Sequence, residues 1–201
     1  MTTARDLAIV ALDVEPTLPV EQGDLSLALA GAEVLDLIEA RALVVDGDRL
    51  LPSAQAPTTE RLLDEAAAAL RRQEPYESVE DWLWRRGRGL FSAYADDLER
   101  AGLTARPRGH LIPLRKGRAE LVDSAARRRA EDRWAAGEPV LAALASAAGI
   151  GDEPAEDAQE PADDTIAAVL AAVGGAVQEL RAVRQRRAIE DAAFDNVWRG
   201  Y

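Results

Sequence analysis

Hydrophobic residues recur at intervals of three and four along most of the chain, the spacing of one face of an α-helix. The pattern is clearest over 24–42, where one stripe holds Leu25, Leu29, Ala32, Leu35 and Ile38. We predict further helices over 5–13, 59–73, 79–86, a stretch ending at Arg100, 117–135, 139–147, 165–186 and 187–198. The chain should therefore be mostly α.

Two short segments have the pattern of β-hairpins. Asp46-Gly47 separates two apolar runs at 43–45 and 49–51, and glycine supplies the positive φ of a tight turn. Residues 104–115 resemble a second hairpin. Asp24 and Ser78 are predicted N-caps. The prediction is one globular helical domain over 1–201 with two short β-hairpins.

Composition narrows the class of protein. The 201 residues are enough for one domain with a full core. The chain has no Cys, so disulfides and thiolate metal sites are excluded. No signal sequence and no run of about 18 uncharged apolar residues is recognisable. We expect a water-soluble, cytoplasmic protein that can lie peripherally at the inner face of the membrane.

Charge is distributed unevenly. The formal net charge is −12, which as a whole repels nucleic acid and anionic lipid. Residues 151–164 hold seven acids and no base, which predicts a solvated acidic loop. Residues 105–134 hold nine Arg or Lys and four Asp or Glu, so a basic surface is still available.

The strongest candidate site is a cluster of tryptophans and arginines on the helix predicted at 79–86. It consists of Trp82, Trp84, Arg85, Arg86 and Arg88. Guanidinium groups bind phosphate through forked hydrogen bonds, and tryptophan favours membrane interfaces. In the alternative, Trp82 is a core residue and the arginines are solvated. The sequence leaves both interpretations open.

The second candidate is the later hairpin, where basic residues flank an apolar tip. The bases are Arg106, Arg108, Arg115, Lys116 and Arg118, and the tip includes Leu111, Ile112 and Leu114. Such a hairpin can insert its tip into a membrane interface while the bases meet anionic head groups. Alternatively, the apolar residues pack on the domain. Arg127, Arg128, Arg129 and Arg133 are interpreted as a solvated helix face.

No catalytic constellation is apparent. His110 is the single histidine and follows a glycine in a predicted turn. The sequence contains no Gly-x-Ser-x-Gly elbow and no phosphate-binding Gly-x-x-x-x-Gly-Lys-Ser/Thr loop. We therefore expect no enzyme, no cofactor and no metal site.

Several segments in order resemble the Golgi phosphoprotein 3 family, in particular its shorter, bacterial-type members. They are ALD at 11–13, LALAGAEVLDLIEARALVVDGDRL at 27–50, APTTERLLDEA at 56–66, SVEDWL at 78–83 and DLERAGLT at 97–104. The resemblance implies a mainly helical fold and, as in Golgi members, recognition of phosphatidylinositol 4-phosphate. The family's four head-group positions fall at Glu21, Ala30, Arg88 and Phe91, and Arg88 alone keeps the family's residue type.

Three hypotheses follow. The chain is a lipid-binding protein that docks on an anionic membrane surface or a phosphoinositide-like ligand. Alternatively, it is an adaptor for basic peptide tails of other proteins, which the family also binds, or a winged-helix-like transcriptional regulator. The first sixty residues hold eleven acids and three bases, the wrong sign for a DNA backbone, so no nucleic-acid partner is expected.

Overall fold

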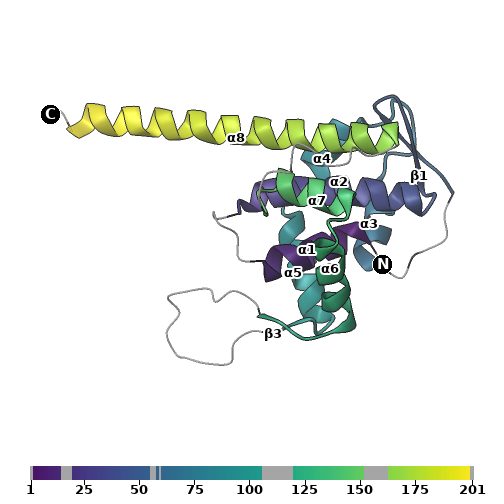
Figure 1. Ribbon diagram of the computed structural model, residues 1–201. Coiled ribbons are helices and arrows are strands. Elements are labelled where there is room, and N and C mark those ends of the chain that lie inside the picture. Colours follow the sequence, from purple (N-terminus) through teal and green to yellow (C-terminus); the bar gives the residue numbers. More distant parts are fainter. Residues whose placement is uncertain are drawn as a thin grey trace.

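α2 (Gln22–Glu39) lies at the centre of the computed structural model, and other helices surround it (Figure 1). Every residue from Asp24 to Leu37 is buried, so this helix has no solvated face over most of its length. The helices packed against it include α1 (Thr3–Asp13), α5 (Leu90–Arg100), α7 (Pro139–Ala147) and α8 (Asp164–Arg199). The structure describes residues 2–14, 20–54, 58, 60–105, 120–151 and 163–199, with side chains up to 192.

The predicted mostly α, single-domain fold is confirmed, and several boundaries agree closely. α4 (Val79–Arg86) and α7 begin and end at the predicted residues. Ser78 caps α4, since its Oγ accepts a hydrogen bond from the Asp81 amide at 3.0 Å. The remaining helices are α3 (Arg61–Ala69) and α6 (Ala125–Ala135).

Both predicted hairpins have paired strands. β1 (Leu43–Asp46) pairs antiparallel with β2 (Arg49–Pro52), and Gly47 in the turn has the positive φ of 61° that the sequence predicted. β3 (Thr104–Ala105) pairs with β4 (Glu120–Leu121). The second strand therefore lies beyond the predicted end at 115. Residues 106–119, between these strands, are outside the described part of the chain.

Three local predictions are wrong. α6 begins at Ala125 and not at 117, because the Ser124 hydroxyl caps it by accepting from the Arg127 amide at 3.1 Å. The two helices predicted over 165–186 and 187–198 are one continuous helix, α8. Asp24 is not the N-cap of α2; it lies in the first turn, and Glu21 occupies the cap position.

α8 is long and apolar enough over residues 164–192 to cross a membrane, by length and composition alone. Only 22% of its most apolar window is buried, and one such helix is weak grounds for a membrane span. Its buried residues recur at helical spacing, at Val169, Val173, Ala176 and Val177, and the helix packs on α2. Gly31 permits this close approach, since a Cβ there would lie 2.3 Å from a Val173 methyl.

Asp36 of α2 holds the start of α1. Its carboxylate accepts hydrogen bonds from the Thr3 amide at 2.7 Å and the Ala4 amide at 3.0 Å. These amides belong to the first turn of α1, where backbone N–H groups have no partner within the helix. Burial raises the pKa of Asp36 from 3.8 to about 6, although both backbone hydrogen bonds act to lower it.

We expect Asp36 to make the protein less stable as pH rises. Between about pH 4 and about pH 6 the folded chain keeps a proton that the unfolded chain has lost, so the free energy of unfolding falls over this interval. A pKa difference of this size corresponds to about 3 kcal/mol. Urea titrations at several pH values should show a smaller decline for Asp36→Asn than for wild type. Parallel curves for the two proteins would contradict this assignment.

Candidate functional site

Trp82 lies on α4 and packs into the core. Its side chain is fully buried, and its indole Nε1 donates a hydrogen bond to the backbone oxygen of Ala30 at 3.2 Å. A buried tryptophan with a satisfied N–H has the environment of a core residue. The structure therefore supports the core interpretation of Trp82, and this ring is not accessible to an external ligand.

Arg85 is engaged by its own domain. Its Nε and Nη2 donate to the two carboxylate oxygens of Glu77, both at 2.6 Å, and Nη2 also donates to the Ala69 carbonyl at 3.1 Å. The guanidinium lies 5.1 Å from the centre of the Trp82 ring. Hydrogen bonding to Glu77 raises the pKa of Arg85. Because Glu77 is buried and neutralises it, Arg85 has little attraction left for an external anion.

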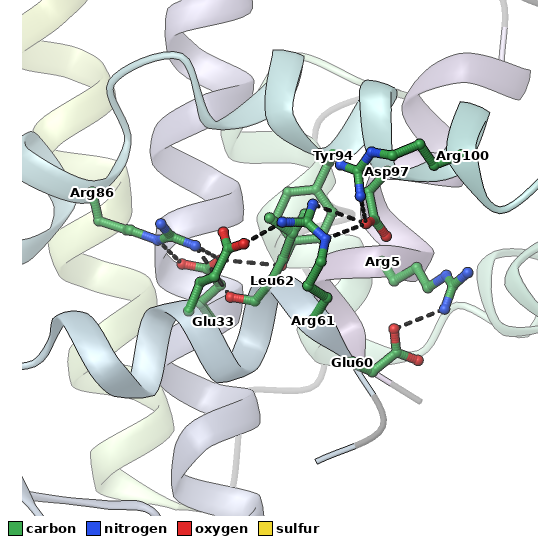
Figure 2. A network of polar contacts seen from close by, with 10 residues as sticks. Arg5, Glu33, Glu60, Arg61, Leu62, Arg86, Tyr94, Asp97 and Arg100 are labelled. Carbon is green, nitrogen blue, oxygen red and sulfur yellow. Dashed lines mark hydrogen bonds and ion pairs between the residues drawn. The ribbon is translucent and has the colours of Figure 1, made fainter. Parts of the chain in front are cut away.

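Arg86 forms a second forked ion pair, with Glu33 of the central helix (Figure 2). Its Nε and Nη2 lie 2.7 and 2.8 Å from the Glu33 oxygens, and Nη2 also donates to the Leu62 carbonyl at 3.2 Å. The Glu33 side chain is 0% exposed. Tyr94 on α5 donates its hydroxyl to Glu33 at 3.2 Å. Burial raises the pKa of Glu33, whereas the bonds from Arg86 and Tyr94 lower it.

Further ion pairs continue this network toward the surface (Figure 2). Arg61 on α3 and Arg100 on α5 both donate to Asp97, at 2.9 and 3.0 Å. Arg5 on α1 pairs with Glu60 at 2.7 Å. The network therefore joins four helices around α2, and its arginines serve the fold.

Trp84 and Arg88 have a different environment from their neighbours. Both line a cavity of about 270 Å³. Arg88 is exposed and has no ion pair with any residue that the structure describes. The other lining residues come from α2, from the junction of α4 and α5, and from α8; they are Gln22, Gly23, Ser26, Leu27, Gly87, Gly89, Ser92 and Leu180. Of the predicted cluster, the structure leaves Trp84 and Arg88 available to a ligand.

Two helix N-termini meet at this cavity. α2 begins at Gln22 and has no side-chain hydrogen bond at its cap. α5 begins at Leu90, whose amide donates to the Gly87 carbonyl at 3.3 Å. The Ser26 hydroxyl of α2 accepts from the Phe91 amide of α5 at 3.2 Å, which places the two starts side by side. The uncapped N–H groups of α2 and the dipoles of both helices favour negative charge at these ends. Together with Arg88, they make the cavity suited to a phosphate or carboxylate.

α8 forms the remaining wall and is fixed by ion pairs. Arg181 donates to Asp24 at 2.8 Å, and Arg184 also bonds to Asp24, whose side chain is 2% exposed. Arg184 lies 3.0 Å from Glu21 as well. Because Arg184 neutralises Glu21, this carboxylate at the α2 cap opposes an anionic ligand less than its position alone would suggest.

The basic hairpin is the second candidate site that the sequence predicts. Arg106, Arg108, Leu111, Ile112, Leu114, Arg115, Lys116 and Arg118 all lie outside the described residues, as does His110. The helix that follows, α6, is not simply a solvated basic face as predicted. Arg127 pairs with Asp13 at 2.7 Å and Arg133 with Asp6 at 2.6 Å, so both fasten α6 to α1.

Sequence reasoning missed the contributions of α2, α5 and α8 to the cavity. Neither Glu21 nor Gln22 is a typical capping residue, and this could have indicated a helix N-terminus with free N–H groups. The sequence instead predicts Asp24 as the cap. Nothing in the spacing indicated Leu180, which is more than 150 residues from Gln22. Within the described ranges, no group of three or more His, Cys, Asp or Glu residues could hold a metal ion.

The chain matches one model among known protein families. A family model described as Golgi phosphoprotein 3 (GPP34) matches residues 4–192, which is nearly the whole chain. The match includes every residue that lines the cavity. No individual curated protein matches the sequence.

Proposed function

Because the chain belongs to the Golgi phosphoprotein 3 family, we propose that it is a non-enzymatic binding protein that docks on anionic membrane surfaces. The cavity between α2, α4, α5 and α8 takes a phosphate-bearing head group. The observation that carries this proposal is the free Arg88 guanidinium beside the uncapped N-terminus of α2. On this proposal the protein is cytoplasmic and peripheral at the inner face of the membrane.

The location of the cavity also supports the proposal. Of the four positions that correspond to the head-group site of Golgi members, Arg88 lines the cavity and Glu21 precedes the first residue of α2, whose start opens onto it. Phe91 lies in the first turn of α5, and its amide meets Ser26 in the wall. Ala30 is fully buried. With one arginine in place of three, the site holds a phosphate through fewer forked hydrogen bonds and selects less strictly for phosphatidylinositol 4-phosphate than the site of Golgi members.

The net negative charge of the protein opposes its binding to an anionic membrane. A net charge of −12 repels an anionic membrane at long range, so attraction must come from local groups at the cavity and from the basic hairpin. Binding should therefore weaken steeply with salt. The apolar Trp84 wall supplies a contribution that salt does not screen.

Arg88→Ala should reduce co-sedimentation with anionic vesicles by about tenfold to a hundredfold, because one charge-assisted hydrogen bond contributes about 1.5–3 kcal/mol. Arg71→Ala is the matched control, since Arg71 is exposed and lies outside the cavity. Neutral vesicles should bind neither protein. Equal binding by wild type and Arg88→Ala would reject the cavity as the docking site.

A second variant distinguishes the contribution of the cavity to vesicle binding from that of the hairpin. The fourfold change of Arg106, Arg108, Arg115 and Lys116 to Ala removes the bases around the apolar tip. If this variant alone loses vesicle binding, the hairpin carries the docking. If both variants lose it, the two elements act together. Binding of a soluble phosphorylated head group should depend on Arg88 and not on the hairpin.

The adaptor hypothesis remains the second candidate, because the N-terminal part is acidic and could attract basic peptide tails. Pull-down with a basic peptide tests it. The winged-helix hypothesis loses its main support. α2 would be the recognition helix, but its residues from Asp24 to Leu37 are buried, so it has no free face for a DNA groove.

A further inference from the structure

Two arginines of α8 bond the two carboxylates at the start of α2. Arg184 bonds Glu21, the residue before the helix, at 3.0 Å, and it also bonds Asp24, the third residue of the helix. Arg181 donates to the other Asp24 oxygen at 2.8 Å. Leu180, which lines the cavity, precedes Arg184 by four residues, so both side chains lie on the same face of α8. The arginines therefore act at the helix start that opens onto the cavity.

Glu21 and Asp24 occupy the positions from which side chains usually cap a helix. The residue before the first turn and the third residue of that turn can reach back to the N–H groups that have no partner within the helix. At α2, in the described part of the chain, Glu21 makes no such bond, and both Asp24 oxygens bond the arginines of α8. The N–H groups of Gln22 and Gly23, which line the cavity, are therefore left free.

The start of α7 shows that a glutamate can cap a helix of this chain. Glu138 precedes α7 as Glu21 precedes α2, and its carboxylate accepts from the Val140 and Leu141 amides at 3.3 and 2.9 Å. Glu138 also pairs with Arg133 at 2.9 Å, so an ion pair within one segment of the chain does not prevent capping. At α2 the arginine belongs to a neighbouring helix, and the Glu21 carboxylate bonds it and no amide of α2.

We propose that Arg184 is a positioning residue for the anion cavity: by holding Glu21, it keeps the protein's own carboxylate off the free N–H groups of α2. These groups then stay open to a phosphate, which Arg88 meets in the same cavity. Without Arg184, the Glu21 carboxylate turns back and caps α2, as the equivalent glutamate caps α7, while Asp24 stays bound to Arg181. The inference rests on the proposed function for its ligand, whereas the capping step belongs to the free protein.

Proton–nitrogen correlation spectra of the full chain, recorded without and with inorganic phosphate, test this role. Without phosphate, Arg184→Ala should shift the Gly23 or Asp24 amide signal, because a capping side chain bonds the second or third amide of its helix. With phosphate, Arg184→Ala should bind about fivefold to tenfold more weakly than wild type, the fold-change that corresponds to one helix cap. Combining Arg184→Ala with Glu21→Ala should reverse both changes, because alanine cannot cap the helix.

Arg181→Ala is the matched control, since it removes an equal charge from α8 but leaves Glu21 bound to Arg184. It should bind phosphate more tightly than Arg184→Ala does. Glu21→Ala alone, at a side chain that is 63% exposed, should bind phosphate at least as tightly as wild type. The double variant also lacks Arg184, so damage to α8 would persist in it, and recovered binding excludes that cause.

Three results would overturn the proposal. If the double variant binds as weakly as Arg184→Ala, then Arg184 is a direct ligand of the phosphate. If Arg181→Ala weakens binding equally, the effect is one of lost charge. If the amide signals of phosphate-free Arg184→Ala are unchanged, Glu21 does not cap α2. Because these signals are read without a ligand, they decide the capping step even if wild type binds no phosphate, a result that rejects the proposed function by itself.

Discussion

Replacing Glu33 with alanine should lower the free energy of unfolding by about 3–5 kcal/mol, the cost of removing one partner of a buried ion pair. The Glu33 side chain is 0% exposed and that of Arg86 is 17% exposed. Removing the carboxylate leaves the Arg86 guanidinium with the Leu62 carbonyl as its hydrogen-bond acceptor, and it also removes the acceptor of the Tyr94 hydroxyl. Urea denaturation near pH 7 measures the loss directly.

The matched control replaces both partners. Glu33→Leu combined with Arg86→Leu removes the pair without leaving an isolated charge, so the double variant should be more stable than Glu33→Leu alone. If the single and double variants are equally unstable, the packing around Glu33 is the cause and not the unpaired guanidinium. Vesicle binding by the folded double variant should be close to that of wild type, because Arg86 does not line the cavity.

Replacing Trp82 with alanine should also cost about 3–5 kcal/mol of unfolding free energy, as for other fully buried aromatic side chains. Trp82 is the largest fully buried side chain of the described part, and it joins α4 to α2 through its bond to the Ala30 carbonyl. Trp82→Phe keeps most of the apolar volume but loses that bond, so its cost should be smaller, about 1–3 kcal/mol. Thermal or urea unfolding distinguishes the three proteins.

Trp84→Ala is the control for Trp82→Ala, because the two variants should differ in their effects on stability and on vesicle binding. Trp84 is partly buried and lines the cavity, so its loss should weaken vesicle binding more than it weakens the fold. If the folded fraction of Trp82→Ala loses vesicle binding as strongly as Trp84→Ala does, then Trp82 contributes to the ligand site and its assignment as a core residue is incomplete.

These contrasts arise because the arginines of α4 and the arginine just after it have different partners. Arg85 and Arg86 are adjacent, yet each is bound by a different buried carboxylate, Glu77 and Glu33. Arg88 lies past the end of α4, where the chain turns toward α5, and no described carboxylate meets it. A cluster of like residues in the sequence therefore divides into two that hold the domain together and one that is open to a ligand.

The amino-acid sequence alone predicts the features that depend on neighbouring residues. Ser78 and Gly47 fixed the start of α4 and the β1–β2 turn, because a cap and a tight turn are set within a few residues. The order of the motifs between 11 and 104 was enough to identify the family, which the match over 4–192 confirmed. The apolar spacing predicted most helices, although it could not show that α8 is continuous.

Which charged groups are free depends on contacts that form when the helices pack together. Glu33 is 53 residues from Arg86, and Asp24 is 160 residues from Arg184. Such pairs depend on which helices lie side by side, and helical spacing along one segment contains no information about this. The cavity has the same origin, since its walls come from the start of α2, the α4–α5 junction and Leu180. Local sequence sets where helices begin and end, whereas packing around α2 determines which arginine remains available to bind.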